Sequence, residues 1–177
     1  MHRFTWDLRY PGPTTAGGAE GPMGPVAVPG TYTVRLKAGA VTQTQPLTLL
    51  EDPRVAHDGI TLDDLRAQFA HNMRVRDLVS DANRMVARLR AAQQRMKSGG
   101  AADKAKLARL DELGSHLVTP PVRYSKPELL THITYLYSMT NFADQRPGRD
   151  AIARLQLLRK ELDARKAELD SIVGPSM

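Results

Sequence analysis

The spacing of apolar residues changes near Asp52-Pro53, and this change constrains the fold more than any other feature of the chain. Before it, apolar and polar residues alternate over 4–10 and again over 31–37, as in half-buried β-strands. After it, apolar residues recur every three or four positions, as on the buried stripe of amphipathic helices. We therefore expect an α+β protein that is mostly α, with a β region at 1–53 and a helical region at 54–177.

The β region is expected to hold a partial antiparallel sheet of about three strands. The first two are the alternating segments 4–10 and 31–37, and a third, 41–50, follows a glycine-containing turn. Pro46 places the third strand at a sheet edge or a bulge, because proline has no N–H to donate. Residues 11–30 are so rich in glycine and proline that a long loop is expected there.

The helical region is expected to hold four helices, at about 61–97, 102–117, 126–143 and 149–173. Thr61 is a favourable N-cap for the first of them. The third begins with a capping-box pattern, Ser125-Lys126-Pro127-Glu128. Short connections favour an up-and-down antiparallel bundle or extended helical hairpins, with the β-hairpin docked at one end as a cap.

Composition excludes several kinds of site. The 177 residues include no cysteine, which rules out disulfide scaffolds, thiolate metal sites and cysteine nucleophiles. The whole formal net charge of +6 lies in 54–177, because residues 1–53 hold four basic and four acidic groups. This excess permits an acidic partner without requiring one. No apolar run approaches the ~20 residues of a membrane span, and the segment after Met1 predicts a strand, not a signal peptide.

Few residues are candidates for catalysis or metal binding. The histidines are scattered, and for His71 and His132 a helix-surface or boundary position is favoured over a metal-ligand role. Asp77 and Asp81 could be paired carboxylates for acid–base work, but the arginines around them favour i,i+4 ion pairs on a solvated face. The sequence contains no phosphate-binding glycine loop and no serine nucleophile motif. We therefore predict no catalytic residue, no cofactor and no metal.

Two groups of residues are candidates for binding. A basic tract on the first long helix, with no acid between Ala82 and Ala102, could contact an acidic partner or neutralise phosphates. The helix lacks interleaved aromatics and any recognition motif, which disfavours nucleic acid. Trp6 and Tyr10 could form a platform for carbohydrate, but their alternation with Phe4 and Leu8 favours the core face of the sheet. The residues of the basic tract are Arg84, Arg88, Arg90, Arg95 and Lys97.

Three motifs of the β region carry a resemblance to a known family. The segments 3–11 (RFTWDLRYP), 28–36 (VPGTYTVRL) and 51–54 (EDPR) are similar to the C-terminal region of sortilin-like β-propeller proteins, described as BNR or Asp-box repeat glycosyl-hydrolase-related proteins. The strand pair is also similar to the Ig-like domain of flagellar hook-capping proteins. The helices from Tyr135 to Leu162 are similar to the closing helices of the sortilin-like β-propeller proteins, so the resemblance to that family covers most of the chain.

The resemblance implies a non-catalytic accessory segment that acts in domain packing or protein interaction within a larger, exported protein. The Asp-box turns of the family's N-terminal propeller do not occur here, so no catalytic or sugar-binding residue is carried over. Because an Ig-like sandwich has about seven strands, we expect the chain to be a C-terminal fragment of a truncated gene product. Its expected partners are the missing propeller and Ig-like strands, another protein, or a second copy of itself.

Two alternative functions remain open. One is a basic helical module that binds an acidic partner or nucleic acid through the tract that begins at Arg84. The other is a small glycosidase-associated enzyme, which is disfavoured because no pair of carboxylates stands on strand ends or loops beside aromatic residues.

Overall fold

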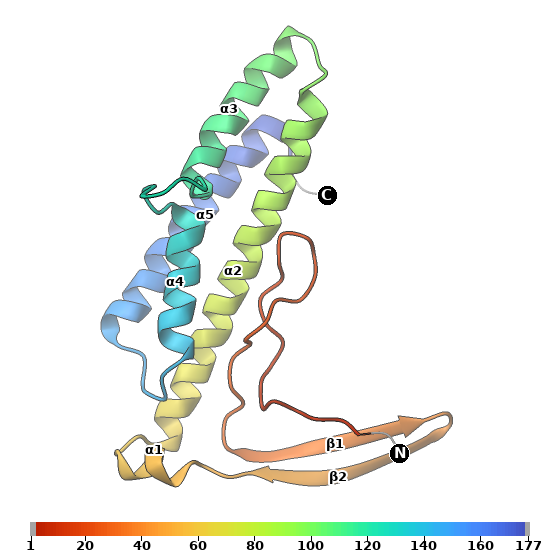
Figure 1. Ribbon diagram of the computed structural model, residues 1–177, viewed down its shortest axis with the longest axis vertical. Helices are drawn as coiled ribbons and strands as arrows, with labels where there is room; N and C mark the ends of the chain where they lie inside the picture. Colours follow the sequence, from red (N-terminus) through yellow and green to blue (C-terminus); the bar gives the residue numbers. More distant parts are fainter. Residues whose placement is uncertain (1–2, 176–177) are drawn as a thin grey trace.

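The computed structural model describes residues 3–175, which form two strands followed by one short and four long helices. The strands form an antiparallel hairpin, and the helices pack into an elongated bundle (Figure 1). The α+β, mostly helical class expected from the apolar spacing is therefore confirmed. The elements are β1 (Gly30–Ala38), β2 (Val41–Leu49), α1 (Pro53–His57), α2 (Leu62–Met96), α3 (Ala101–Leu117), α4 (Leu129–Asn141) and α5 (Arg149–Val173).

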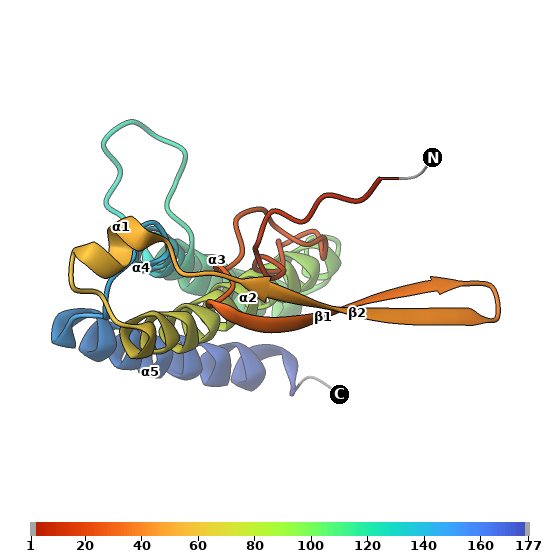
Figure 2. The same ribbon diagram turned by 90° about the horizontal axis from the view of Figure 1, so that it is seen from below.

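The four long helices are arranged in three columns. Helix α2 runs the length of the bundle, α3 and α4 follow one another back along it, and α5 turns again to run beside them (Figure 1). Helices α3 and α4 therefore point the same way, which differs from an alternating up-and-down bundle. The cause is the connection 118–128, which protrudes from the bundle and does not reverse the chain direction (Figure 2).

The core follows the apolar stripes expected from the sequence. Helix α2 packs against α3, α4 and α5, and each of these helices turns its leucine or isoleucine positions toward it. Full burial of one such side chain contributes roughly 1.5–3 kcal/mol to folding, so these stripes dominate the stability of the bundle. The core includes Val75, Leu78, Ala82, Met85, Leu89, Leu110, Leu113, Leu117, Ile133, Leu158, Leu162 and Leu169.

Two helix starts test the capping predictions. Thr61 is the N-cap of α2, and its Oγ1 accepts a hydrogen bond from the Asp64 backbone N–H at 3.2 Å. The Asp64 carboxylate accepts the Thr61 N–H at 3.1 Å, and the hydrogen bonds from Thr61 lower the pKa of Asp64. The predicted capping box at Ser125 is wrong: Ser125 Oγ donates to the Val122 carbonyl at 2.8 Å, which ties it to a turn, and α4 begins only at Leu129.

The predicted strand over 4–10 is wrong, and the sheet has two strands instead of three. Leu8 has a positive φ of 62°, which interrupts an extended segment. The Asp7 carboxylate accepts the Arg9 N–H at 3.0 Å, and Trp6 Nε1 donates to the Arg9 carbonyl at 3.0 Å. These local bonds close a turn, as short polar side chains do when they compete with strand pairing. A single bridge, Arg9 to Val26, remains.

The Gly/Pro-rich segment is a loop, as expected, and it is docked on the bundle. The Met23 carbonyl accepts hydrogen bonds from Tyr137 Oη at 2.8 Å and from Asn141 Nδ2 at 2.9 Å. Glycine is required at position 24, because a Cβ there would lie 1.6 Å from the Tyr10 carbonyl oxygen. The loop therefore holds its shape through close backbone approach and through side chains of α4.

The β1–β2 hairpin projects sideways from one end of the bundle (Figures 1 and 2). Within residues 3–175 its strands pack against each other and against no helix. The expected docking of the hairpin as a cap is therefore wrong. The helices bury their stripes against one another, and the 11–29 loop contacts α2 and α4, so the bundle core closes without the hairpin.

Candidate interaction site

The hairpin has one apolar and one polar face. Directly paired residues of an antiparallel ladder point to the same side of the sheet, so the register assigns each side chain to a face. The polar face carries Thr31, Thr33, Arg35, Lys37, Thr42, Thr44, Pro46 and Thr48. The other face, called the apolar face below, carries Tyr32, Val34, Leu36, Ala38, Val41, Leu47 and Leu49 together with Gln43 and Gln45.

The outer part of the apolar face is exposed. Val34 is 52% exposed, Leu36 64% and Val41 61%, and no helix of the described chain contacts the hairpin. A lone two-stranded ribbon is marginally stable in water and normally packs on a further layer. Contiguous exposed apolar surface of this kind marks interaction sites. The hairpin is therefore the leading candidate for a functional surface.

The base of the hairpin is held by aromatic contacts. The Trp6 ring meets the Tyr32 ring edge-on, with centroids 5.4 Å apart, and Tyr32 Oη donates to the Val28 carbonyl at 2.6 Å. Burial and the neighbouring Tyr10 phenol raise the pKa of Tyr32, which keeps this donor protonated. Tyr10 itself packs on Phe69 of α2, at 4.8 Å between centroids. The base is thus anchored near the bundle, while the outer part of the hairpin extends away from it.

The expected core positions in the N-terminal segment are only partly occupied. Trp6 is half-buried against Tyr32, and Tyr10 lies against α2. Phe4, in contrast, is 89% exposed, because the turn that follows it prevents the segment from pairing as a strand. The common core face expected for Phe4, Trp6, Leu8 and Tyr10 does not form.

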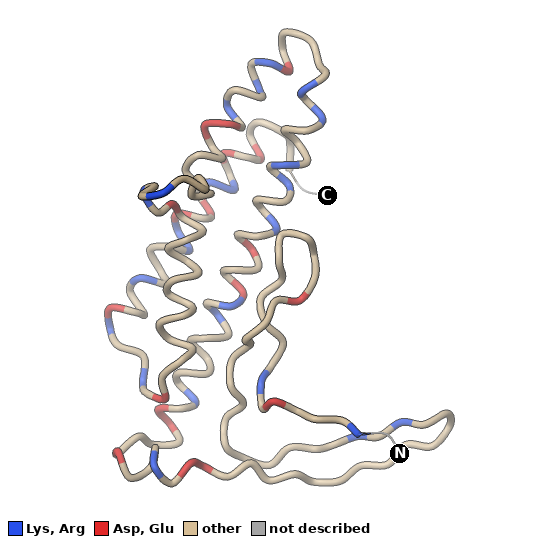
Figure 3. Tube along the Cα trace, in the orientation of Figure 1, with Lys and Arg blue, Asp and Glu red and all other residues tan. Residues whose placement is uncertain are grey.

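The structure divides the basic tract of α2 into two parts. Arg84 pairs with Asp81 at 2.6 Å, and Arg88 donates to the Asp170 carboxylate and the Gly174 carbonyl at the end of α5. Arg84 is therefore paired within α2, and Arg88 joins α2 to the end of α5. The other three, Arg90, Arg95 and Lys97, form no ion pair within residues 3–175 and lie near the α2–α3 end of the bundle (Figure 3). Arg90 and Lys97 line a groove of about 220 Å³ together with Asp111.

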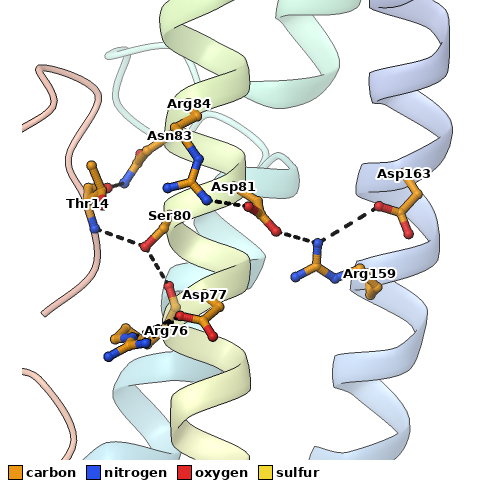
Figure 4. Close-up of polar contacts among 9 residues, drawn as sticks. All are labelled: Thr14, Arg76, Asp77, Ser80, Asp81, Asn83, Arg84, Arg159 and Asp163. Atoms are coloured by element: carbon orange, nitrogen blue, oxygen red, sulfur yellow. Dashed lines mark hydrogen bonds and ion pairs between the residues drawn. The ribbon is translucent and has the colours of Figure 1, made fainter. Parts of the chain in front are cut away.

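Asp81 is the centre of a polar network on α2 (Figure 4). One of its oxygens lies 2.6 Å from Arg84 Nη2 and the other 2.6 Å from Arg159 Nη1 of α5. Burial alone would raise the pKa of Asp81, but the hydrogen bonds from Arg159 and Arg84 outweigh it and lower this pKa. Asp77 pairs with its neighbour Arg76 at 2.6 Å. Ion pairs at both carboxylates are therefore confirmed, but the expected i,i+4 spacing is wrong: the partners on α2 are one and three positions away, and the bond from Arg159 links two helices.

Ser80 and Asn83, elsewhere on the same helix, bind the N-terminal loop (Figure 4). Ser80 Oγ accepts the Thr14 N–H at 3.0 Å, and Asn83 Nδ2 donates to the Thr14 carbonyl at 2.8 Å. Helix α2 therefore uses one side to join α5 and another to fix the loop.

The histidines lie in unlike environments. The surface or boundary position expected for His71 is wrong: it is buried, and its Nε2 has no hydrogen-bond partner among the described residues. Burial, followed by the charge of Arg74, lowers the pKa of His71 and keeps the ring neutral. His132 is half-buried and lines a pocket of about 540 Å³ between α4 and the start of α5, beside Tyr135 and Met139. No group of three or more potential metal ligands occurs within residues 3–175.

Buried polar contacts that the sequence pattern did not predict join α2 to the end of α4. Gln68 Nε2 donates to the Thr140 carbonyl at 3.0 Å and also to the Ala143 carbonyl. Asn72 Nδ2 donates to the same Thr140 carbonyl at 2.9 Å. The available signal was position, since Gln68 and Asn72 continue the apolar stripe of α2 toward its N-terminus.

Comparisons with known proteins give no relative for this chain. No family model matches the sequence, no curated protein matches it, and no solved structure matches the fold. No helix among residues 3–175 combines the length and apolar character that crossing a membrane requires.

Proposed function

We propose that this chain is a non-catalytic accessory segment of a larger protein of the BNR or sortilin-like β-propeller type. In that protein the apolar face of the hairpin packs against the rest of an Ig-like sandwich. The observation that carries the proposal is the uncovered apolar face, on which Val34, Leu36 and Val41 are each more than half exposed.

Sandwich domains are built by packing two sheets face to face, with the inner residues of both forming the core. The β1–β2 hairpin has the alternation of such an inner face, but no second sheet packs on it within residues 3–175. Full burial of each aliphatic side chain contributes roughly 1.5–3 kcal/mol, so covering this face favours assembly strongly. The family motifs 3–11 and 28–36 lie at and beside the hairpin, which supports the same assignment.

The test begins with the DNA upstream of Met1. An in-frame propeller with further Ig-like strands is expected; a coding region that lacks both would overturn the family part of the proposal. The longer product should then be compared with this chain by hydrogen exchange. We expect the amides of Val34 and Leu36 to exchange more slowly in the longer product, because a covered hairpin opens less often. Unchanged exchange there would contradict packing on the apolar face.

A second candidate function rests on Arg90, Arg95 and Lys97 near the α2–α3 end of the bundle, which form no ion pair among residues 3–175. Exposed basic side chains of this kind are suited to an acidic protein surface or to nucleic acid phosphates. The test is salt-dependent binding to DNA and RNA by the chain and by a variant with Arg90→Glu, Arg95→Glu and Lys97→Glu. A matched control reverses three exposed charges elsewhere, Arg123, Lys126 and Arg149. Equal loss in both variants would assign any binding to net charge alone.

A further inference from the structure

The two outer edges of the hairpin are not equivalent, and Pro46 is the reason. In a regular antiparallel ladder, hydrogen-bonded pairs alternate with non-hydrogen-bonded pairs. Pro46 is paired with Thr33 in an unbroken register and has no N–H to donate, so this pair is a non-hydrogen-bonded one. Both residues of such a pair direct their backbone groups away from the partner strand. The outer edge of β2 therefore lacks a donor at position 46.

The outer edge of β1 is complete. By the same alternation, Thr31, Thr33, Arg35 and Lys37 all direct N–H and C=O groups outward. Within residues 3–175, no hydrogen bond from another segment reaches these groups. A row of free donors and acceptors on an extended strand is a template for adding a further strand.

The charge on this edge selects the partner. The hairpin carries Arg35 and Lys37 and no acidic residue, as the blue segments near its tip show (Figure 3). Pairing with β1 of a second copy would bring four positive charges together, and like charges on paired strands are destabilising. A strand with Asp or Glu on the polar side and apolar residues on the other side complements both faces of β1.

We propose that the outer edge of β1 binds an extended acidic strand, in which Asp or Glu alternates with apolar residues. The acidic side chains lie beside Arg35 and Lys37, and the apolar ones extend the apolar face beside Val34 and Leu36. The inference rests on the proposed function in taking the hairpin as an interaction element, and it assigns the strand to the larger protein. Pro46 keeps the β2 edge from binding in the same way.

The test uses a soluble nine-residue peptide that alternates valine with glutamate, and residue-resolved amide exchange of the full chain measured by NMR. We expect the outward amides of Thr33, Arg35 and Lys37 to be protected at least about tenfold at saturating peptide. The outward amides of Thr42 and Thr44 on β2 should not change. Protection of the β2 amides instead, or of neither edge, would overturn the proposal.

Two variants separate edge pairing from general adhesion. Thr33→Pro removes an outward donor from β1, as Pro46 does naturally on β2, and should abolish the protection of the remaining β1 amides. Thr44→Pro makes the same change on the other edge and should leave peptide binding intact. Hairpin cross-peaks in both variants verify that the strands still pair.

A peptide with lysine in place of glutamate tests the charge argument. It should not protect β1, and the effect of the glutamate peptide should weaken as salt is raised. Equal protection by the two peptides would contradict selection of an acidic strand. Sedimentation as a dimer without peptide, together with protection of the outward amides of Thr33, Arg35 and Lys37, would assign the edge to a second copy and also overturn the proposal. Neither result bears on the apolar face, which the longer product tests separately.

Discussion

The hairpin should be energetically independent of the helical bundle, and a pair of variants measures this directly. Val34→Thr combined with Leu36→Thr changes two side chains that are 52% and 64% exposed and that touch no helix. Threonine keeps the preference for a strand, and exposed substitutions usually change stability by less than about 0.5 kcal/mol. Two such changes sum to at most about 1 kcal/mol, which for a chain of this size shifts the thermal midpoint by about 2–4 °C, so the helices should melt within about 4 °C of the unchanged chain.

Leu110→Ala is the matched change in the core. Leu110 is fully buried on α3, and truncation of a buried leucine to alanine costs about 2–5 kcal/mol. The same conversion predicts a midpoint lowered by about 4–20 °C. Thermal melts followed by far-UV circular dichroism, which reports the helices, provide the measurement. A hairpin variant that lowers the midpoint as much as Leu110→Ala would show that the hairpin packs on the bundle, and would refute an available apolar face.

Three further predictions concern the bundle and its loop. Arg88→Leu removes the donor to Asp170 and to the end of α5 and should lower the free energy of unfolding in urea by about 1–3 kcal/mol. Arg90→Leu, the control, should lower it by less than about 0.5 kcal/mol. Equal losses would contradict the role of Arg88 in joining the helices. Burial and then the charge of Arg74 hold the pKa of His71 below its ordinary value of 6.5, so below pH 6.5 the unfolded chain binds a proton that the folded chain does not. The contribution of neutral His71 to stability is complete above pH 6.5 and is lost as the pH falls through the lower folded-state pKa. Urea midpoints measured from about pH 8 to pH 5 should therefore fall less in His71→Gln than in the unchanged chain. Parallel curves for the two proteins would refute this. Gly24→Ala forces the loop off α4 and so removes part of the cover over Tyr137. The pKa of Tyr137, which burial raises to about 12, should then fall toward its ordinary value of 10.0 in an ultraviolet titration. An unchanged titration would contradict the docked loop.

Most of the helical architecture could be predicted from the sequence, because each long helix has its own apolar stripe and its own end signals. The expected first helix at 61–97 corresponds to α2, Leu62–Met96, with Thr61 as its cap. The wrong predictions concern polar side chains that can form hydrogen bonds with more than one nearby backbone group. Ser125 bonds within a turn instead of capping α4, and Asp7 closes a turn instead of leaving 4–10 extended.

The sequence pattern could predict which residues share the apolar side of the hairpin, but not whether that side is exposed. Alternation over 31–37 identified the apolar side of β1, yet it could not tell whether another layer covers Val34 and Leu36. The basic tract shows the same limit. Only the position of α5 separates Arg88, which caps that helix, from Arg90, which has no ion-pair partner among the described residues.

By itself, the sequence determined the local elements and the apolar side of each, because periodicity, caps and proline or glycine positions act over a few neighbouring residues. It also determined that one strand has no backbone donor at Pro46, whereas the register of the hairpin placed that gap on the outer edge of β2. The tertiary structure alone decided that α3 and α4 share one direction, that the loop docks through Met23, and that the hairpin lies uncovered. These outcomes depend on contacts between residues far apart in the chain, whose pairing no local pattern records.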